Sequence, residues 1–80
     1  LIPSKDSLFE TVLIAVNDEL VDLFLNRKIE YKMISALLLK IINFKNLKKY
    51  CKVKPISIEQ IYKTRNHAKR VVKTYVSESY

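Results

Sequence analysis

The sequence contains no glycine, whereas average usage of roughly 7% would place about five or six in a chain of this length. Glycine supplies positive φ angles and lets a backbone approach a phosphate closely, so the Walker loop and the dinucleotide-binding fingerprint both depend on it. Its absence excludes both motifs from these 80 residues. It also predicts that the loops need no positive φ.

Cysteine and histidine are nearly as scarce, with one residue of each. A lone cysteine cannot form an internal disulfide, and one thiol with one imidazole cannot complete a four-ligand zinc site. Cys51 lies in a lysine-rich stretch that could activate its thiol, but no partner base stands beside it. An unreactive thiol is therefore the stronger interpretation.

Long apolar runs are also missing. The longest are residues 12–16 and 34–39, the second of which includes Ser35, and both are far shorter than the roughly 20 residues that span a bilayer. The sequence therefore predicts no transmembrane helix and no signal peptide. With 49% apolar and 29% charged residues, we expect residues 1–80 to form one soluble domain. Because the first residue is Leu1 and not methionine, we expect a fragment of a longer chain.

Charge is distributed unevenly along the chain. Residues 1–30 contain three Lys or Arg and six Asp or Glu, whereas residues 31–80 contain twelve Lys or Arg and two Asp or Glu. The net charge of +7 therefore arises entirely in the later part. Such a basic surface favours nucleic acid or an acidic partner.

A first amphipathic helix is predicted from about residue 8 to Asn26. Ser7 and Glu10 have the spacing of a capping box, in which the hydroxyl accepts from the third amide of the helix and the carboxylate reaches back. The apolar residues follow a 3.6-residue period and predict one buried face. They are Phe9, Val12, Leu13, Val16, Leu20, Leu23 and Phe24.

A second helix is predicted within residues 33–42, where apolar residues alternate at spacings of one and three. The stripe comprises Met33, Ile34, Leu37, Leu38, Ile41 and Ile42, and it is widened by Ala36, Leu39 and Phe44. A helix this apolar is expected to be covered on more than one side. The lysine-rich stretch before Pro55 predicts a basic loop. A short fourth helix over residues 45–53 is the alternative for this stretch.

A third helix is predicted to begin after Ser57, where Gln60 completes a second capping box, and to reach about Ser77. Its expected buried side comprises Ile58, Ile61, Tyr62, Ala68, Val72, Tyr75 and Val76. The fold class is therefore all-α, a small bundle of three main helices.

Carboxylates cluster once, at Asp18, Glu19 and Asp22. Asp18 and Asp22 stand one helical turn apart and could hold a cation or share a proton, but no histidine or further ligand is near them in sequence. A solvated acidic face is the stronger interpretation. His67 is likewise interpreted as an ordinary surface histidine, with a catalytic or proton-sensing role as the weaker alternative. We predict no catalytic, cofactor-binding or metal-binding residue in this segment.

The outward side of the third helix is a candidate basic partner face. It comprises Lys63, His67, Arg70 and Lys73. Clustered cations suffice for phosphate contacts, and tyrosines could stack on bases. Lysine outnumbers arginine twelve to three, however, and arginine is the better reader of bases. A free-standing basic helical module that binds nucleic acid or an acidic partner is thus the alternative function, with nucleic acid disfavoured.

The segment from Thr11 to Ile29, TVLIAVNDELVDLFLNRKI, resembles the C-terminal domain of the 1-deoxy-D-xylulose 5-phosphate reductoisomerase family. The family carries there a segment of the type VLNAANExAVxxFLxxxI. Matching residues are Val12, Leu13, Ala15, Asn17, Val21, Phe24, Leu25 and Ile29. Asp18 stands where the family segment has glutamate. Ile14, Val16 and Met33 depart from the family pattern. The resemblance continues through the second helix, Ser57-Ile58-Glu59 and Ala68-Lys69-Arg70.

The resemblance implies the helical C-terminal domain of an enzyme of isoprenoid biosynthesis, which isomerises and reduces deoxyxylulose phosphate to methylerythritol phosphate. It implies NADPH and a divalent metal for the parent chain, with their ligands upstream of this segment. The bundle would then pack against the catalytic domain as a buttress and be inactive alone. The resemblance further implies a homodimeric parent in a bacterial cytoplasm or a plastid-type organelle.

Overall fold

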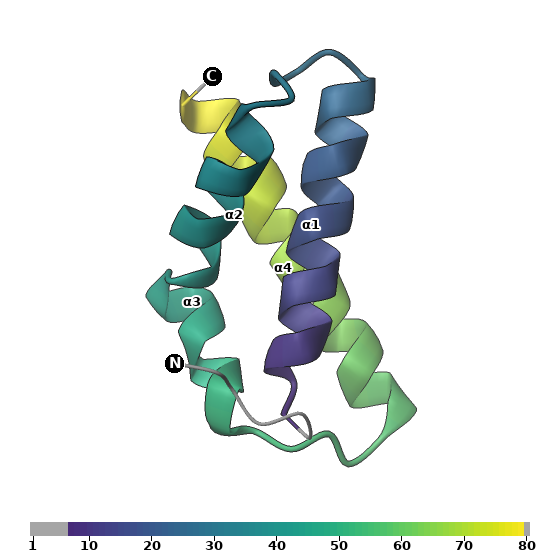
Figure 1. The fold of residues 1–80 in the computed structure, drawn as a ribbon. Coiled ribbons are helices and arrows are strands. Elements are labelled where there is room, and N and C mark those ends of the chain that lie inside the picture. Colours follow the sequence, from purple (N-terminus) through teal and green to yellow (C-terminus); the bar gives the residue numbers. More distant parts are fainter. Residues whose placement is uncertain (1–6, 80) are drawn as a thin grey trace.

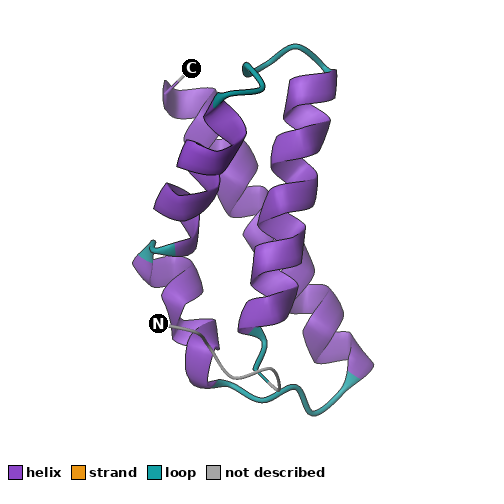
Figure 2. Cartoon of the chain, viewed as in Figure 1, coloured by secondary structure: helices purple, strands orange, loops and turns teal. Residues whose placement is uncertain are grey.

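The computed structural model describes residues 7–79. They form helices α1 (Phe9–Leu25), α2 (Met33–Ile42), α3 (Lys45–Lys48) and α4 (Ile58–Ser79), with the 3-10 helix η1 (Lys49–Lys52) between α3 and α4. No strand occurs in this described part, so the all-α prediction is confirmed. The chain rises through α1, returns through α2, α3 and η1, and rises again through α4, which crosses α1 (Figure 1). The loops lie mainly at the two ends of the bundle (Figure 2).

The core lies where α1 packs against both α2 and α4. Its buried members are Val12, Ala15, Val16, Leu20, Ile29, Leu37, Ile41, Leu47, Ala68, Val72 and Val76. One predicted member, Leu13, is 37% exposed, whereas Ala15 and Glu19 are buried in its place. The prediction was wrong there because the face of α1 between two neighbouring helices is centred closer to Ala15 and Glu19, with Leu13 at its edge.

Helix α2 is covered on one side, and the prediction of wider coverage was wrong. Leu37 and Ile41 are buried, but Leu39 is 63% exposed. Ala36 is exposed as well. The physical reason is that α1 is the one long helix that packs extensively on α2.

Helix α4 is buried along a stripe of residues spaced four apart: Thr64, Ala68, Val72 and Val76. Its first turns were predicted to be buried, but Ile58 is 74%, Ile61 is 37% and Tyr62 is 59% exposed. Because α4 crosses α1 at an angle, its start lies away from the other helices (Figure 1). Apolar side chains at that end therefore remain open to solvent.

The two predicted capping sites differ in detail. Ser57 Oγ accepts a hydrogen bond from the amide of Gln60 at 3.1 Å, and Gln60 Oε1 accepts from the amide of Ile56 at 2.8 Å, one residue before the predicted position. At α1, Ser7 Oγ accepts from the amide of Phe9 at 3.3 Å, two residues on and not three. Both serines therefore satisfy a free amide at a helix start.

The end of α1 overturns the expectation that no loop needs a positive φ. Arg27 has φ of 61°. The amide of Arg27 donates to the carbonyl of Phe24 at 3.0 Å, and the amide of Lys28 donates to the carbonyl of Leu23 at 2.8 Å. This is the Schellman arrangement that glycine usually closes. In this chain, which contains no glycine, Arg27 occupies the left-handed position.

Replacing Arg27 by glycine is expected to raise the free energy of unfolding by about 0.5–1 kcal/mol, because the left-handed backbone costs an ordinary residue roughly 1–2 kcal/mol, while glycine's unfolded-state entropy offsets part of the gain. Urea unfolding of the chain measures the change. Asn26→Gly is the matched control. Asn26 has φ of −91°, and its side-chain amide donates to the carbonyl of Asp22 at 2.9 Å, so glycine there should destabilise. A loss of stability in Arg27→Gly would contradict the strain argument.

Candidate interaction surfaces

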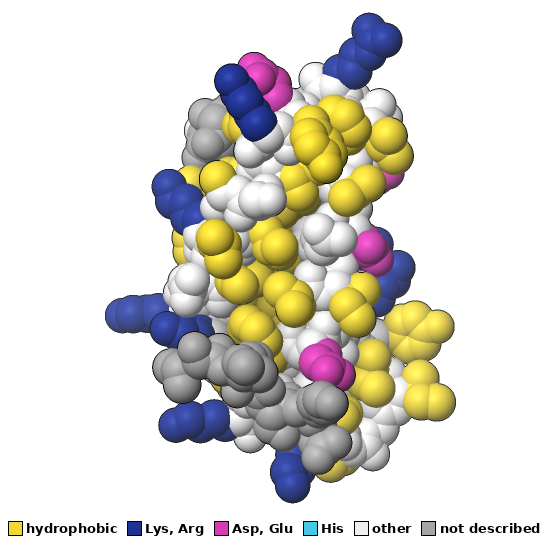
Figure 3. All heavy atoms as spheres, viewed as in Figure 1, with side chains coloured by type: hydrophobic (Ala, Val, Ile, Leu, Met, Phe, Trp, Pro, Cys, Tyr) yellow, Lys and Arg dark blue, Asp and Glu magenta, His cyan; other side chains and the backbone are white. Residues whose placement is uncertain are grey.

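An apolar stripe runs along the outward side of α1. We define it as Ile14, Val21 and Leu25, which are 61%, 36% and 69% exposed. Their spacings of seven and four place them on one line of the helix, opposite the core. Figure 3 shows hydrophobic side chains along much of this view of the molecule, with Lys and Arg side chains mainly at its margins. An apolar surface rimmed by charge is typical of a packing interface.

The carboxylate cluster of α1 is divided by the fold. Asp18 and Asp22 are exposed, as predicted for a solvated face. Glu19 is only 4% exposed, so that interpretation was wrong for this residue. Glu19 lies on the core side of α1, one turn from both Ala15 and Val16. No group of three or more His, Cys, Asp or Glu side chains within residues 7–79 is arranged to hold a metal ion.

His67 joins α4 to η1 and is not an ordinary surface histidine. Its Nδ1 lies 2.8 Å from the hydroxyl of Tyr50, and the two rings meet edge to face with centroids 5.9 Å apart. The ammonium of Lys49 lies over the ring of Tyr50, 5.2 Å from its centroid. Burial lowers the pKa of His67, and the positive charges of Lys49 and Arg70 lower it further. Burial also raises the pKa of Tyr50.

We expect His67 to make the bundle less stable in mild acid. Since folding lowers its pKa below the ordinary value of 6.5, the folded chain favours the neutral ring. The resulting stabilisation is complete above about pH 6.5 and is lost as the pH falls through the lower folded-state pKa. Urea unfolding at several pH values should therefore show a smaller decrease from pH 7 to pH 5 for His67→Gln than for the unchanged chain. The two chains share all carboxylates, so equal decreases would contradict this role.

The predicted basic face is not a uniform surface. Lys63 pairs with Glu59 at 3.3 Å, and both side chains are largely exposed, so the pair contributes little to stability. Arg70 and Lys73 are exposed, whereas His67 is partly buried against η1. Lys49 of η1 therefore approaches the part of α4 that carries His67 and Arg70.

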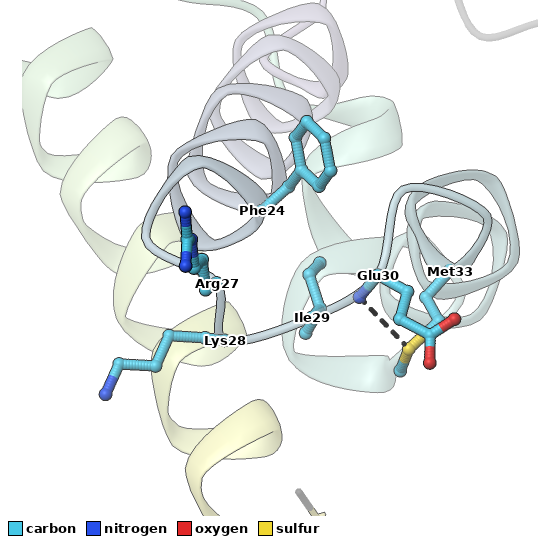
Figure 4. Close-up of a pocket in the computed structure, with 6 residues that line it drawn as sticks. All are labelled: Phe24, Arg27, Lys28, Ile29, Glu30 and Met33. Carbon is cyan, nitrogen blue, oxygen red and sulfur yellow. Dashed lines mark hydrogen bonds between the residues drawn. The ribbon is translucent and has the colours of Figure 1, made fainter.

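Residues 7–79 form surface hollows outside the core, of which two are described. One, of about 480 Å³, lies between the end of α1 and the start of α2 and is lined by Phe24, Arg27, Lys28, Ile29, Glu30 and Met33. Figure 4 shows the two basic side chains beside the end of α1, and Glu30 beside Met33, whose Sδ accepts a hydrogen bond from the amide of Glu30 at 3.5 Å. The other, of about 360 Å³, is lined by Phe44, Asn46, His67, Arg70, Val71, Thr74, Tyr75 and Glu78.

Residues 7–79 thus form a small helical domain with exposed apolar and basic surfaces, and its core is built from helix faces together with Ile29 of the loop after α1. The sequence matches the family described as DXP reductoisomerase C-terminal domain over residues 3–71, and the chain belongs to this family. The resemblance stated from the Thr11–Ile29 segment is therefore confirmed.

A curated relative supports the same assignment. The chain is 47% identical over 58 residues to 1-deoxy-D-xylulose 5-phosphate reductoisomerase of Pelagibacter ubique (strain HTCC1062). The matched region covers 72% of this chain and 15% of the relative. The matched region therefore spans less than a fifth of the relative's length. No solved structure matches the chain.

Proposed function

We propose that this chain is the supporting C-terminal domain of a reductoisomerase that converts deoxyxylulose phosphate to methylerythritol phosphate for isoprenoid biosynthesis. The observation that carries the proposal is the family match over residues 3–71, together with 47% identity to a curated reductoisomerase. In this proposal the bundle stabilises the catalytic part of the same polypeptide and contributes no residue to the chemistry.

The parent would use NADPH and a divalent metal, as the family resemblance implies, but residues 7–79 do not fit either group. They contain no cluster of three potential metal ligands, and the chain has no glycine for a diphosphate-binding turn. We therefore assign both groups to the rest of the polypeptide and derive no reaction step from this domain. The homodimer and the bacterial-cytoplasm or plastid-type location of the parent rest on the same resemblance. No helix in the described part of the chain is long and apolar enough to cross a membrane.

We assign the contact with the catalytic part to the apolar stripe of α1. Ile14 and Leu25 are 61% and 69% exposed, so they can be covered without rearranging the core. The relative is far longer than the matched region, and in this proposal the partner is the remainder of a similarly long polypeptide. Burial of apolar surface contributes roughly 25 cal/mol per Å², so covering these side chains would stabilise the contact between the bundle and the catalytic part.

The test uses the intact protein and follows oxidation of NADPH when deoxyxylulose phosphate is added. We expect activity in the unchanged protein and a decrease of about tenfold or more for Ile14→Asp, because a carboxylate buried at an interface costs several kcal/mol. Lys63→Ala, an exposed substitution on α4, is the control and should retain activity.

The outcomes separate the two parts of the proposal. Absence of substrate-dependent NADPH oxidation by the intact, folded protein would overturn the reductoisomerase function. Full activity in Ile14→Asp would leave that function in place and overturn the assignment of the α1 stripe as the contact. The alternative function, a free-standing basic module for nucleic acid or an acidic partner, finds no support in the comparisons and is not proposed.

A further inference from the structure

The hollow of about 360 Å³ is called here the hollow beside η1, because His67 in its lining contacts Tyr50 of η1. It combines positive charge with neutral hydrogen-bond donors. Arg70 supplies a guanidinium, Asn46 a side-chain amide and Thr74 a hydroxyl, and all three line the same space of about 360 Å³. His67 adds its imidazole, whose Nδ1 lies 2.8 Å from the Tyr50 hydroxyl, and in the tautomer that accepts from this hydroxyl Nε2 is a further donor. Four polar side chains from two segments therefore line one hollow.

Neither Lys49 nor Arg70 forms an ion pair within the described residues. Ion pairs are formed there by Lys32 and Lys63, and neither lies in the hollow. Lys49 and Arg70 both act on His67 by direct repulsion of its protonated form, which indicates a positive potential at this end. The one acid of the lining, Glu78, stands eight residues beyond Arg70 along α4, about 12 Å by helical rise. The basic end is thus separated from the acidic end.

The other hollow differs in the position of its carboxylate. Arg27 and Lys28 line it, but Glu30 stands within the same short loop, so a carboxylate lies beside the two cations. Both hollows also have apolar lining residues, so the position of the carboxylate distinguishes them. The hollow beside η1 is therefore the better site for an anion.

We propose that the basic end of the hollow lined by Asn46, His67 and Arg70 binds a phosphate-type oxyanion. The planar fork of arginine donates two parallel hydrogen bonds to such a group, and imidazole and amide donors can occupy the remaining oxygens. A bound anion attracts each positive group and so offsets the repulsion that Lys49 and Arg70 exert on the protonated form of His67. This site is independent of the proposed enzymatic function, because it requires only the fold of the bundle.

The experiment titrates inorganic phosphate into the intact protein at constant ionic strength and follows the ring nitrogens of His67 by NMR. We expect saturable shifts with a dissociation constant of about 1 mM. At saturation the pKa of His67 should rise, since a neighbouring anion favours the protonated ring. Arg70→Ala should weaken binding by about tenfold, the loss of one charge-assisted contact.

Arg65→Ala is the matched control. It removes the same charge from the same helix, but Arg65 lies about 140° around α4 from Arg70, away from the hollow. We expect Arg65→Ala to bind phosphate as the unchanged protein does, with both variants retaining the wild-type amide spectrum elsewhere. Shifts that never saturate, or an equal loss of binding in both variants, would mean diffuse attraction to a basic surface and would overturn the proposed site.

Discussion

Replacing Leu20 by alanine is expected to lower the free energy of unfolding by about 3 kcal/mol, within the 2–5 kcal/mol range for such truncations in a core. Leu20 is 0% exposed and belongs to the cluster in which α1 meets α2 and α4. Truncation removes buried methyl groups and leaves a cavity, because the three surrounding helices can move only partly into the vacated space. Small domains have only about 5–15 kcal/mol of total stability, so this one change removes a large fraction.

Urea unfolding followed by helical circular dichroism measures the effect, with Leu39→Ala as the matched control. Leu39 has the same side chain but is 63% exposed on α2, so its truncation should change stability by no more than about 0.5 kcal/mol. If both variants lose the same stability, helix propensity and not core packing would explain the effect, and the assignment of Leu20 to the core would be wrong.

The sequence predicted the helices well because their signals are local. The periodic apolar residues located α1 and α2, and Ser57 marked the start of α4 through a hydroxyl that accepts from the amide of Gln60. The extent of coverage could not be predicted in the same way. Leu39 and Ile58 are apolar and helical, yet they are exposed because no neighbouring helix reaches them. Periodicity identifies a face of one helix, whereas burial depends on where the other helices end.

The candidate sites were less predictable because they join distant segments. His67 and Tyr50 are 17 residues apart, and no spacing rule pairs a histidine on one helix with a tyrosine on a separate 3-10 turn. The positive φ of Arg27 was missed for a different reason. The lack of glycine was interpreted as a lack of left-handed positions, but the closing hydrogen bonds of α1 outweigh the roughly 1–2 kcal/mol that such a backbone costs.

Replacing Ala68 by aspartate is expected to lower the free energy of unfolding by about 3–5 kcal/mol, the cost of an uncompensated charge in a core. Ala68 is 0% exposed on α4, and Ala15 is 1% exposed on α1, the main packing partner of α4. Small side chains at such positions allow the two helices to approach closely. Ala68→Leu adds volume without charge and should cost less, about 1–3 kcal/mol.

The control for Ala68→Asp is Asn66→Asp, which introduces the same carboxylate two residues earlier on the same helix. Asn66 is exposed, so the change should stay within about 0.5 kcal/mol. Urea unfolding of the three variants thus separates charge, volume and helix propensity. Since α4 contacts the rest of the bundle mainly through α1, an Ala68→Asp chain that unfolds at the wild-type urea concentration would mean that α4 is not packed at Ala68, and the described bundle would be incorrect.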